Sequence, residues 1–194
     1  MVMKHKHIYI ILGVILFNVI RGDIKNFPKF YKNLVYVCFI NVLYYVVCRR
    51  HLLWEFMPLS SDWRLIRVGY VLVVTPLIVL SFLSRCPRLL WPRILYIVRW
   101  VLAASAIENF FHKQKVIQYK HGWNIWWSAL VYLKIFLYSY FIKKKPLIIC
   151  FLTFCSMVFF IVKFKIPINK NHTFSRKFNR SVDFFYHSFL EDVF

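Results

Sequence analysis

The stretch KHGWNIWWSALVYL, residues 120–133, places polar and aromatic side chains at the start of a long apolar run. On a helical wheel at about 100° per residue, polar and aromatic residues separate onto two sides. One side carries His121, Asn124, Ser128 and Tyr132, and the other carries Trp123, Trp126 and Trp127. Lipid offers polar side chains no hydrogen-bonding partner, so the polar side must face other helices or water. Tryptophan prefers the membrane interface, so the stretch predicts a membrane helix whose aromatic side lies near lipid headgroups.

Five further apolar segments accompany this one in a chain of 194 residues that is 60% hydrophobic. The six predicted segments are residues 7–20, 30–47, 66–83, 90–111, 123–142 and 146–162. About 20 residues of helix, at about 1.5 Å each, cross a hydrocarbon layer about 30 Å thick. We therefore expect an all-α, polytopic transmembrane helix bundle of about six spans, with residues 1–168 as a single domain. Pro76 lies within the third segment and predicts a kink there.

The C-terminal residues 169–194 differ in character from the rest. Apolar residues recur there at helical spacing, alongside basic residues in the first half. This pattern predicts an amphipathic helix that lies on the membrane surface.

The formal net charge of +20 comes from 27 Lys and Arg residues against seven Asp and Glu. Almost all of the basic residues fall between the apolar segments, where they can meet anionic lipid headgroups. This placement favours a multi-pass protein of the cell membrane with the lipid bilayer as its partner, and it disfavours nucleic acid. We expect no cofactor.

The fourth segment contains VLAASAIENFFHK, residues 101–113, whose small residues permit close helix approach. Glu108 lies within it, and an acid inside a membrane segment is a functional hypothesis by default. His112 follows one helical turn later, and His121 opens the next segment, so all three can gather at one membrane face. Glu108, His112 and His121 are candidates for acid–base chemistry, a proton relay or a metal site, although no metal-ligand motif accompanies them.

Two plainer interpretations remain open for these polar residues. Glu108 can pair with a nearby cation such as Lys115. Asn124, Ser128 and Tyr132, together with Asn41 in the second segment, are candidate binding residues, and they can equally serve as hydrogen bonds between helices.

The blocks ILYIVRWVLAASAIEN, YKHGWNIWWS, KKKPL and FKIPI resemble a family of small multi-pass membrane proteins of Bacillus-like and Clostridium-like Firmicutes. The resemblance covers roughly residues 10–168, and its HGWNIWWS block is the most specific part. It implies a membrane location and a number of spans, without an activity. Two departures are Asn41, where the family pattern has an acid, and PLSSDW, residues 58–63, where it has an Asn-His pair.

Three functions follow as hypotheses. The first is an integral membrane protein with a non-enzymatic, structural or accessory role. The second is a small-solute or proton-coupled transporter. The third is a membrane-embedded enzyme that acts on lipid through Glu108, His112 and His121; no nucleophile motif supports it.

Overall fold

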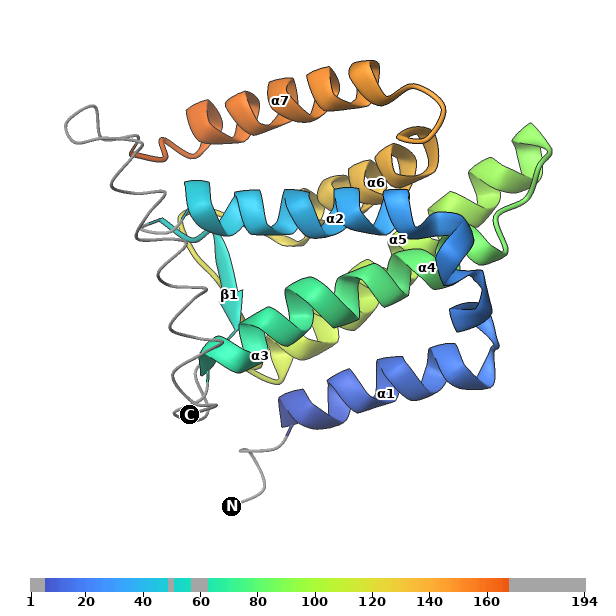
Figure 1. The fold of residues 1–194 in the computed structure, drawn as a ribbon. Helices are drawn as coiled ribbons and strands as arrows, with labels where there is room; N and C mark the ends of the chain where they lie inside the picture. Colours follow the sequence, from blue (N-terminus) through green and yellow to red (C-terminus); the bar gives the residue numbers. More distant parts are fainter. Residues whose placement is uncertain (1–5, 49–50, 57–62, 168–194) are drawn as a thin grey trace, which may run out of the picture.

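The structure, a computed structural model, describes residues 6–48, 51–56 and 63–167, and most of them are helical (Figure 1). Helix α1 spans Lys6–Ile20. A single 3-10 turn, η1 (Asp23–Asn26), leads into α2 (Phe27–Val47), which has a proline in its first turn. The helix predicted within residues 169–194 lies outside the described residues, so it and the domain boundary at residue 168 stay predictions.

The third rod is continuous but changes its winding. It consists of α3 (Trp63–Gly69), the π-helical η2 (Tyr70–Val74) and α4 (Thr75–Ser84). Pro76 has no backbone N–H, so it interrupts the regular series of backbone hydrogen bonds in a helix. A wider π-helical turn accommodates the missing bond. In this turn the Thr75 N–H and the Thr75 hydroxyl both donate to the Tyr70 carbonyl, the hydroxyl at 3.0 Å. The sequence predicted a kink at Pro76, and the structure places a π-helical turn directly before this residue.

Three more helices and a small sheet complete the fold. They are α5 (Leu90–Lys113), α6 (Ile125–Phe141), α7 (Pro146–Lys163), β1 (Trp54–Phe56) and β2 (Ile117–Tyr119). The strands pair antiparallel, with Trp54 opposite Tyr119, so the loops after α2 and α5 are joined. The sequence pattern does not predict these strands, because each is three residues long and their pairing is a long-range contact.

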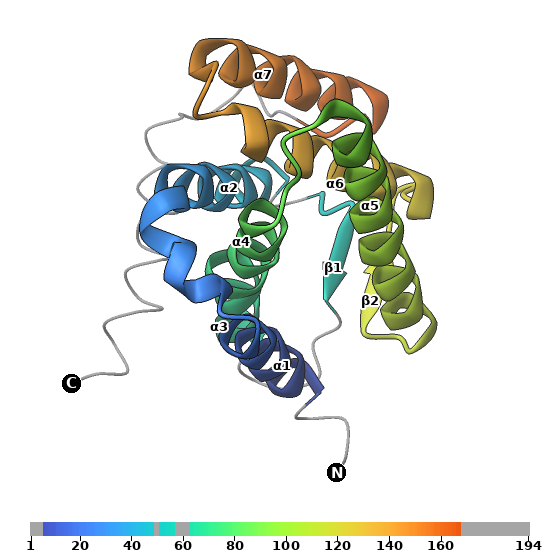
Figure 2. The ribbon, with the colours of Figure 1, turned by 90° about the vertical axis from the view of Figure 1, so that its right-hand side faces the viewer.

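Successive rods run in alternate directions, which gives the bundle two ends (Figures 1 and 2). We call one the sheet end: it holds β1, β2 and the first residues of α1 and α6. We call the other the turn end: it holds the short connections at residues 21–26, 85–89 and 142–145. The six predicted segments coincide with the six rods to within three residues at each boundary, and the predicted all-α class is confirmed.

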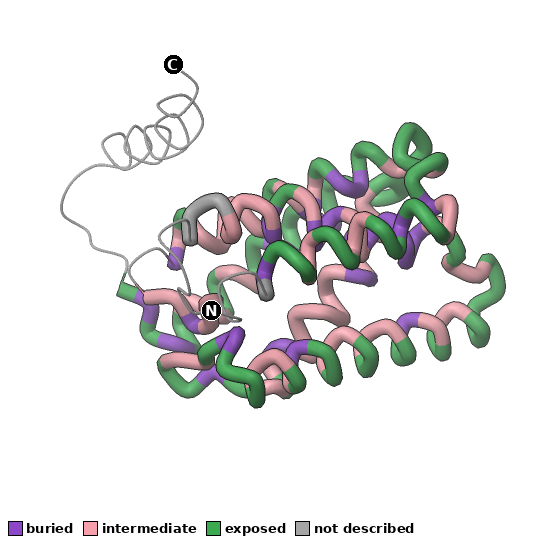
Figure 3. Tube along the Cα trace, turned by 90° about the horizontal axis from the view of Figure 1, so that it is seen from below, coloured by how far each residue is buried: buried purple, intermediate pink, exposed green. Residues whose placement is uncertain are grey.

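Four of the rods have the length and hydropathy to cross a membrane. They are Asp23–Val47, Ile66–Ser84, Leu90–Lys113 and Pro146–Lys163. The apolar stretches His7–Ile20 and Ile125–Phe141 are shorter. Many large apolar side chains along the rods are exposed, among them Leu16, Leu102 and Phe151. Figure 3 shows that exposed positions recur along all of the rods. Such a surface suits lipid as the surrounding solvent.

Two apolar clusters hold the bundle together. The central one joins α2, α4, α5 and α6 through Leu34, Val37, Val79, Leu80, Phe82, Leu83, Ile97 and Phe136. The second lies at the sheet end and consists of Cys48, Leu53, Trp123, Phe164 and Ile166. The second cluster packs the loop before β1 against the start of α6 and the end of α7, and so fixes the surroundings of Glu108.

Candidate functional site

Glu108 lies on the side of α5 that packs against α6, and its side chain is buried. The Ser128 hydroxyl donates to its Oε1 atom, and the Tyr132 hydroxyl donates to its Oε2 atom. Ser128 and Tyr132 are one helical turn apart on the polar side predicted for α6. The expected contact between the polar sides of the fourth and fifth segments is therefore present.

A third hydroxyl reaches Glu108 from outside the helices. Tyr119, the last residue of β2, donates from its hydroxyl to Glu108 Oε1 at 2.7 Å. Burial, followed by the neighbouring Glu108 carboxylate, raises the pKa of Tyr119 above its ordinary value, so the phenol keeps its proton and remains a donor. The pairing of β1 with β2 is what holds Tyr119 in place. We call Glu108, Tyr119, Ser128 and Tyr132 the Glu108 cluster.

Trp123 extends this cluster by one donor. Its indole N–H donates to Ser128 Oγ at 2.8 Å, and its ring packs against Phe160 and Phe164 of the α7 region. The predicted placement of Trp123 at the lipid interface is wrong, because α6 begins at Ile125 and a helical wheel does not apply to the turn before it. Trp126, which lies inside the helix, is 80% exposed as the wheel predicts.

The two candidate histidines have other partners. His112 stacks on Tyr119 with ring centroids 4.2 Å apart, and its Nδ1 atom lies 3.0 Å from the Ile117 carbonyl oxygen. The exposed His121 ring stacks on the half-buried His51 ring, with ring centroids 3.5 Å apart. Within the described part of the chain, no three His, Cys, Asp or Glu side chains are grouped for a metal ion. The structure thus does not bring Glu108, His112 and His121 together as one set of ligands.

The remaining candidates serve their own helices. Asn124 is the N-cap of α6, where its Oδ1 atom accepts from the backbone N–H groups of Trp126 and Trp127 at 3.1 and 3.3 Å. Asn41 donates from its Nδ2 atom to the Val37 carbonyl, one turn back in α2, at 2.9 Å. Among the described residues, no ion pair joins Glu108 to Lys115, which is exposed.

Sequence reasoning missed a second buried carboxylate, at the turn end. Asp23 Oδ2 lies 3.2 Å from Arg21 Nε and accepts from the Ser81 hydroxyl at 3.0 Å. Asp23 Oδ1 lies 3.4 Å from Arg85 Nε, and Ser81 also donates to Asn18 at 3.0 Å. The available signal was the position of Asp23 immediately after the first segment, in a chain with seven acids. Its partners Ser81 and Arg85 are about 60 residues away, so the contact itself needed the fold.

The Glu108 cluster is a set of donors that converge on one acceptor. Each of its three hydroxyls donates to the carboxylate, and the Ser128 oxygen is itself occupied by Trp123. An arrangement of this kind fixes α5, α6 and β2 relative to one another, and its donors are already committed to Glu108. Comparison with known proteins found no matching family model, curated protein or solved structure.

Proposed function

We propose that this chain is an integral membrane protein that crosses the cell membrane six times and has a non-enzymatic, structural or accessory role there. The alternation of the six rods supports six crossings, because each short turn returns the chain to the opposite end of the bundle. The helices α1 and α6, with 15 and 17 residues, are about 22 and 25 Å long. A bilayer accommodates such short spans by local thinning.

The observation that carries the proposal is the saturation of Glu108 by three hydroxyls from α6 and β2. A carboxylate inside a membrane bundle is costly unless neighbouring groups hydrogen-bond to it. Once satisfied, it favours one arrangement of the helices that carry its partners. Many large apolar side chains along the rods are exposed and can meet lipid, while the Glu108 cluster is held inside the bundle.

The distribution of buried polar groups favours this role over transport. The Glu108 cluster lies towards the sheet end of α5 and α6, and the Asp23 cluster lies at the turn end. The central apolar cluster, with fully buried Val79, Leu80 and Phe82, occupies the space between α2, α4, α5 and α6. A transporter needs a polar path from one end to the other.

Two variants of Glu108 test the proposal. Glu108→Ala leaves the buried Ser128 hydroxyl and the half-buried Tyr119 and Tyr132 without their acceptor. It is expected to lower the free energy of unfolding in detergent by about 2–4 kcal/mol. Glu108→Gln keeps one carbonyl acceptor and is expected to lose less than half of that amount. Thermal unfolding of the purified full-length protein measures both. Glu55→Gln is the matched control, because Glu55 is a half-buried acid paired with Lys120 at the same end and should change stability by under about 1 kcal/mol.

Complementation of a gene deletion distinguishes a carboxylate with a structural role from one that takes part in transport or catalysis. Glu108→Gln should restore whatever phenotype deletion of the gene produces, in proportion to the amount of folded protein. A Gln variant that folds and inserts normally yet restores nothing would contradict the proposal and favour the transporter or the lipid-acting enzyme.

A further inference from the structure

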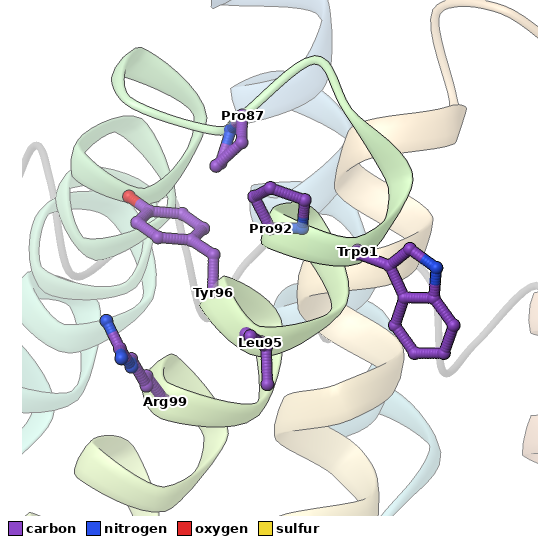
Figure 4. A pocket seen from close by; sticks show the side chains of 6 residues that line it. All are labelled: Pro87, Trp91, Pro92, Leu95, Tyr96 and Arg99. Carbon is purple, nitrogen blue, oxygen red and sulfur yellow. The ribbon is translucent and has the colours of Figure 1, made fainter.

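A recess opens on the outer surface of α5, beside the turn that joins α4 to α5 (Figure 4). Its volume is about 350 Å³, within the range of ligand sites. The lining residues are Pro87, Trp91, Pro92, Leu95, Tyr96 and Arg99. Five of these six present apolar rings or chains, and the Tyr96 hydroxyl already donates to the Phe82 carbonyl at 3.1 Å. Arg99 is therefore the charged group of the recess.

Arg99 sits at a depth where a free charge is unfavourable. It follows Leu90, the first residue of α5, by nine positions, or about 14 Å along the axis. Because the 24-residue helix is about 36 Å long, this position falls inside a hydrocarbon layer about 30 Å thick. Figure 4 shows the Arg99 side chain on the same side of α5 as Tyr96, across the recess from Trp91. A long basic side chain at such a depth can extend towards the membrane interface.

Two other basic side chains of α5 and α6 have partners, whereas Arg99 has none among the described residues. Arg93 donates to the Pro87 carbonyl at 3.0 Å and lies over the Tyr140 ring. Lys134, inside α6, lies 4.7 Å from the centre of the Phe160 ring. For Arg99 no hydrogen bond, ion pair or ring contact is found in residues 6–48, 51–56 and 63–167. An arginine inside a bilayer is stabilised by an anionic partner, and a lipid phosphate is one that the surroundings of an exposed side chain can supply.

The turn end carries positive charge, which attracts anionic lipid. Six basic residues lie in or beside the connections 85–89 and 142–145 of the turn end: Arg85, Arg88, Arg93, Lys143, Lys144 and Lys145. The carboxylate at the described turn end is Asp23, which is buried and already bonded to Arg21, Arg85 and Ser81. Each exposed basic residue near the surface adds about 1 kcal/mol of attraction to anionic lipid.

We propose that the recess binds one anionic phospholipid of the leaflet at the turn end. The lipid phosphate pairs with the Arg99 guanidinium beside Leu95, and the acyl chains run from there along α5 towards the middle of the bilayer. The exposed Trp91 ring, 78% accessible, stands where an interfacial tryptophan borders a headgroup. This inference rests on the membrane location proposed above.

The test uses the full-length protein purified in a neutral detergent and titrated with phosphatidylglycerol or phosphatidylcholine. Native mass spectrometry and the shift in unfolding temperature report bound lipid. The unaltered chain is expected to retain one phosphatidylglycerol in preference to phosphatidylcholine. Arg99→Gln should weaken the apparent affinity at least about tenfold, the effect of losing one charge-assisted hydrogen bond. Leu95→Trp, which keeps Arg99 and fills the recess, should produce a similar loss.

Lys29→Gln is the matched control, because it removes an equal charge from the turn end at an exposed site on α2. Its affinity for phosphatidylglycerol should stay within about twofold of the unaltered chain, as expected for a solvent-screened charge. Equal losses in Lys29→Gln and Arg99→Gln would show diffuse attraction and overturn the site, as would unchanged binding in Arg99→Gln. A chain that stays dissolved without detergent would instead overturn the membrane proposal itself, so the two failures are distinguishable.

Discussion

At the residue scale, the two buried carboxylates obtain their partners in different ways. Glu108 is surrounded by neutral hydroxyls from α6 and β2. Asp23 has two arginine neighbours in addition to Ser81. The difference follows their positions: Glu108 lies on an interior helix face, whereas Asp23 lies at the turn end, where arginine side chains remain half-exposed. Loss of Glu108 leaves the buried Ser128 hydroxyl without its acceptor, whereas loss of Asp23 removes the carboxylate shared by Arg21, Arg85 and Ser81. Both losses have a measurable cost in stability.

Asp23→Ala is expected to destabilise the protein by about 2 kcal/mol. It leaves the buried Ser81 hydroxyl with fewer acceptors and leaves Arg21 and Arg85 without their carboxylate. Asp23→Asn, which keeps an acceptor for Ser81, should lose about half as much. Denaturation in detergent measures both, and an Ala variant as stable as the unaltered chain would show that the cluster contributes nothing net.

The stacked pair of His51 and His121 predicts a pH dependence. Loss of hydration, then the neighbouring His51 and Lys120, lowers the pKa of His121 below its ordinary value of about 6.5. The folded state therefore binds its proton less readily than the unfolded state, so stability is greatest above about pH 6.5 and declines as the pH falls through the folded-state pKa.

His121→Asn should reduce the slope of the unfolding temperature between about pH 7.5 and 5.5. Asparagine suits this position because His121 has a positive φ of 54°, a conformation that asparagine tolerates. Equal slopes for the two proteins would mean that His121 titrates alike in the folded and unfolded states.

At the element scale, local features set where the helices begin and how closely they approach. Asn124 caps α6, and Pro146 occupies the first turn of α7, where a missing N–H costs nothing. Gly69 ends α3 where α1 crosses it. An added Cβ at Gly69 would lie 2.9 Å from the Cδ1 atom of Ile11. The absence of a side chain there permits the contact between α1 and the third rod.

Substitutions at Gly69 test that contact. Gly69→Ala should change stability by under about 1 kcal/mol, because the atom it meets is the end of a flexible side chain and alanine favours the helix. Gly69→Leu should cost about 1–3 kcal/mol by overpacking. Adding Ile11→Ala should recover part of that loss. A double-mutant cycle in detergent measures the coupling between the two positions. Strictly additive effects would show that Ile11 and position 69 do not contact each other.

At the scale of the whole molecule, several polar side chains are buried and many large apolar side chains are exposed, as suits a protein surrounded by lipid. The buried side chains include Asn18, Ser81, Glu108, Ser128 and Ser139. Exposed side chains along the rods include Leu, Phe, Val and Ile throughout. Helix α7 shows the pattern best, since its outer side is almost wholly apolar and carries the exposed thiols Cys150 and Cys155. These two thiols are natural probes of depth.

Cys155 lies nine residues into α7, about 14 Å from the start of the helix. In a chain whose other cysteines are replaced, it should resist a water-soluble maleimide in intact membranes and react after denaturation. A cysteine introduced as Lys144→Cys, in the turn before α7, should react under both conditions. Equal labelling of the two sites in intact membranes would show that α7 does not lie in the bilayer.

The sequence by itself determined the helical class, the six segments and the polar side of α6, because periodicity and apolar length are local properties. It also located Glu108, since an acid in an apolar run is visible without a structure. The partners of Glu108 were less accessible: Ser128 and Tyr132 followed from the wheel, whereas Tyr119 depends on a strand pairing between loops more than 60 residues apart. The Asp23 cluster, the buried Trp123 and the recess beside Arg99 were decided by the tertiary structure alone. Each depends on which distant side chains meet, and local pattern carries no information about that.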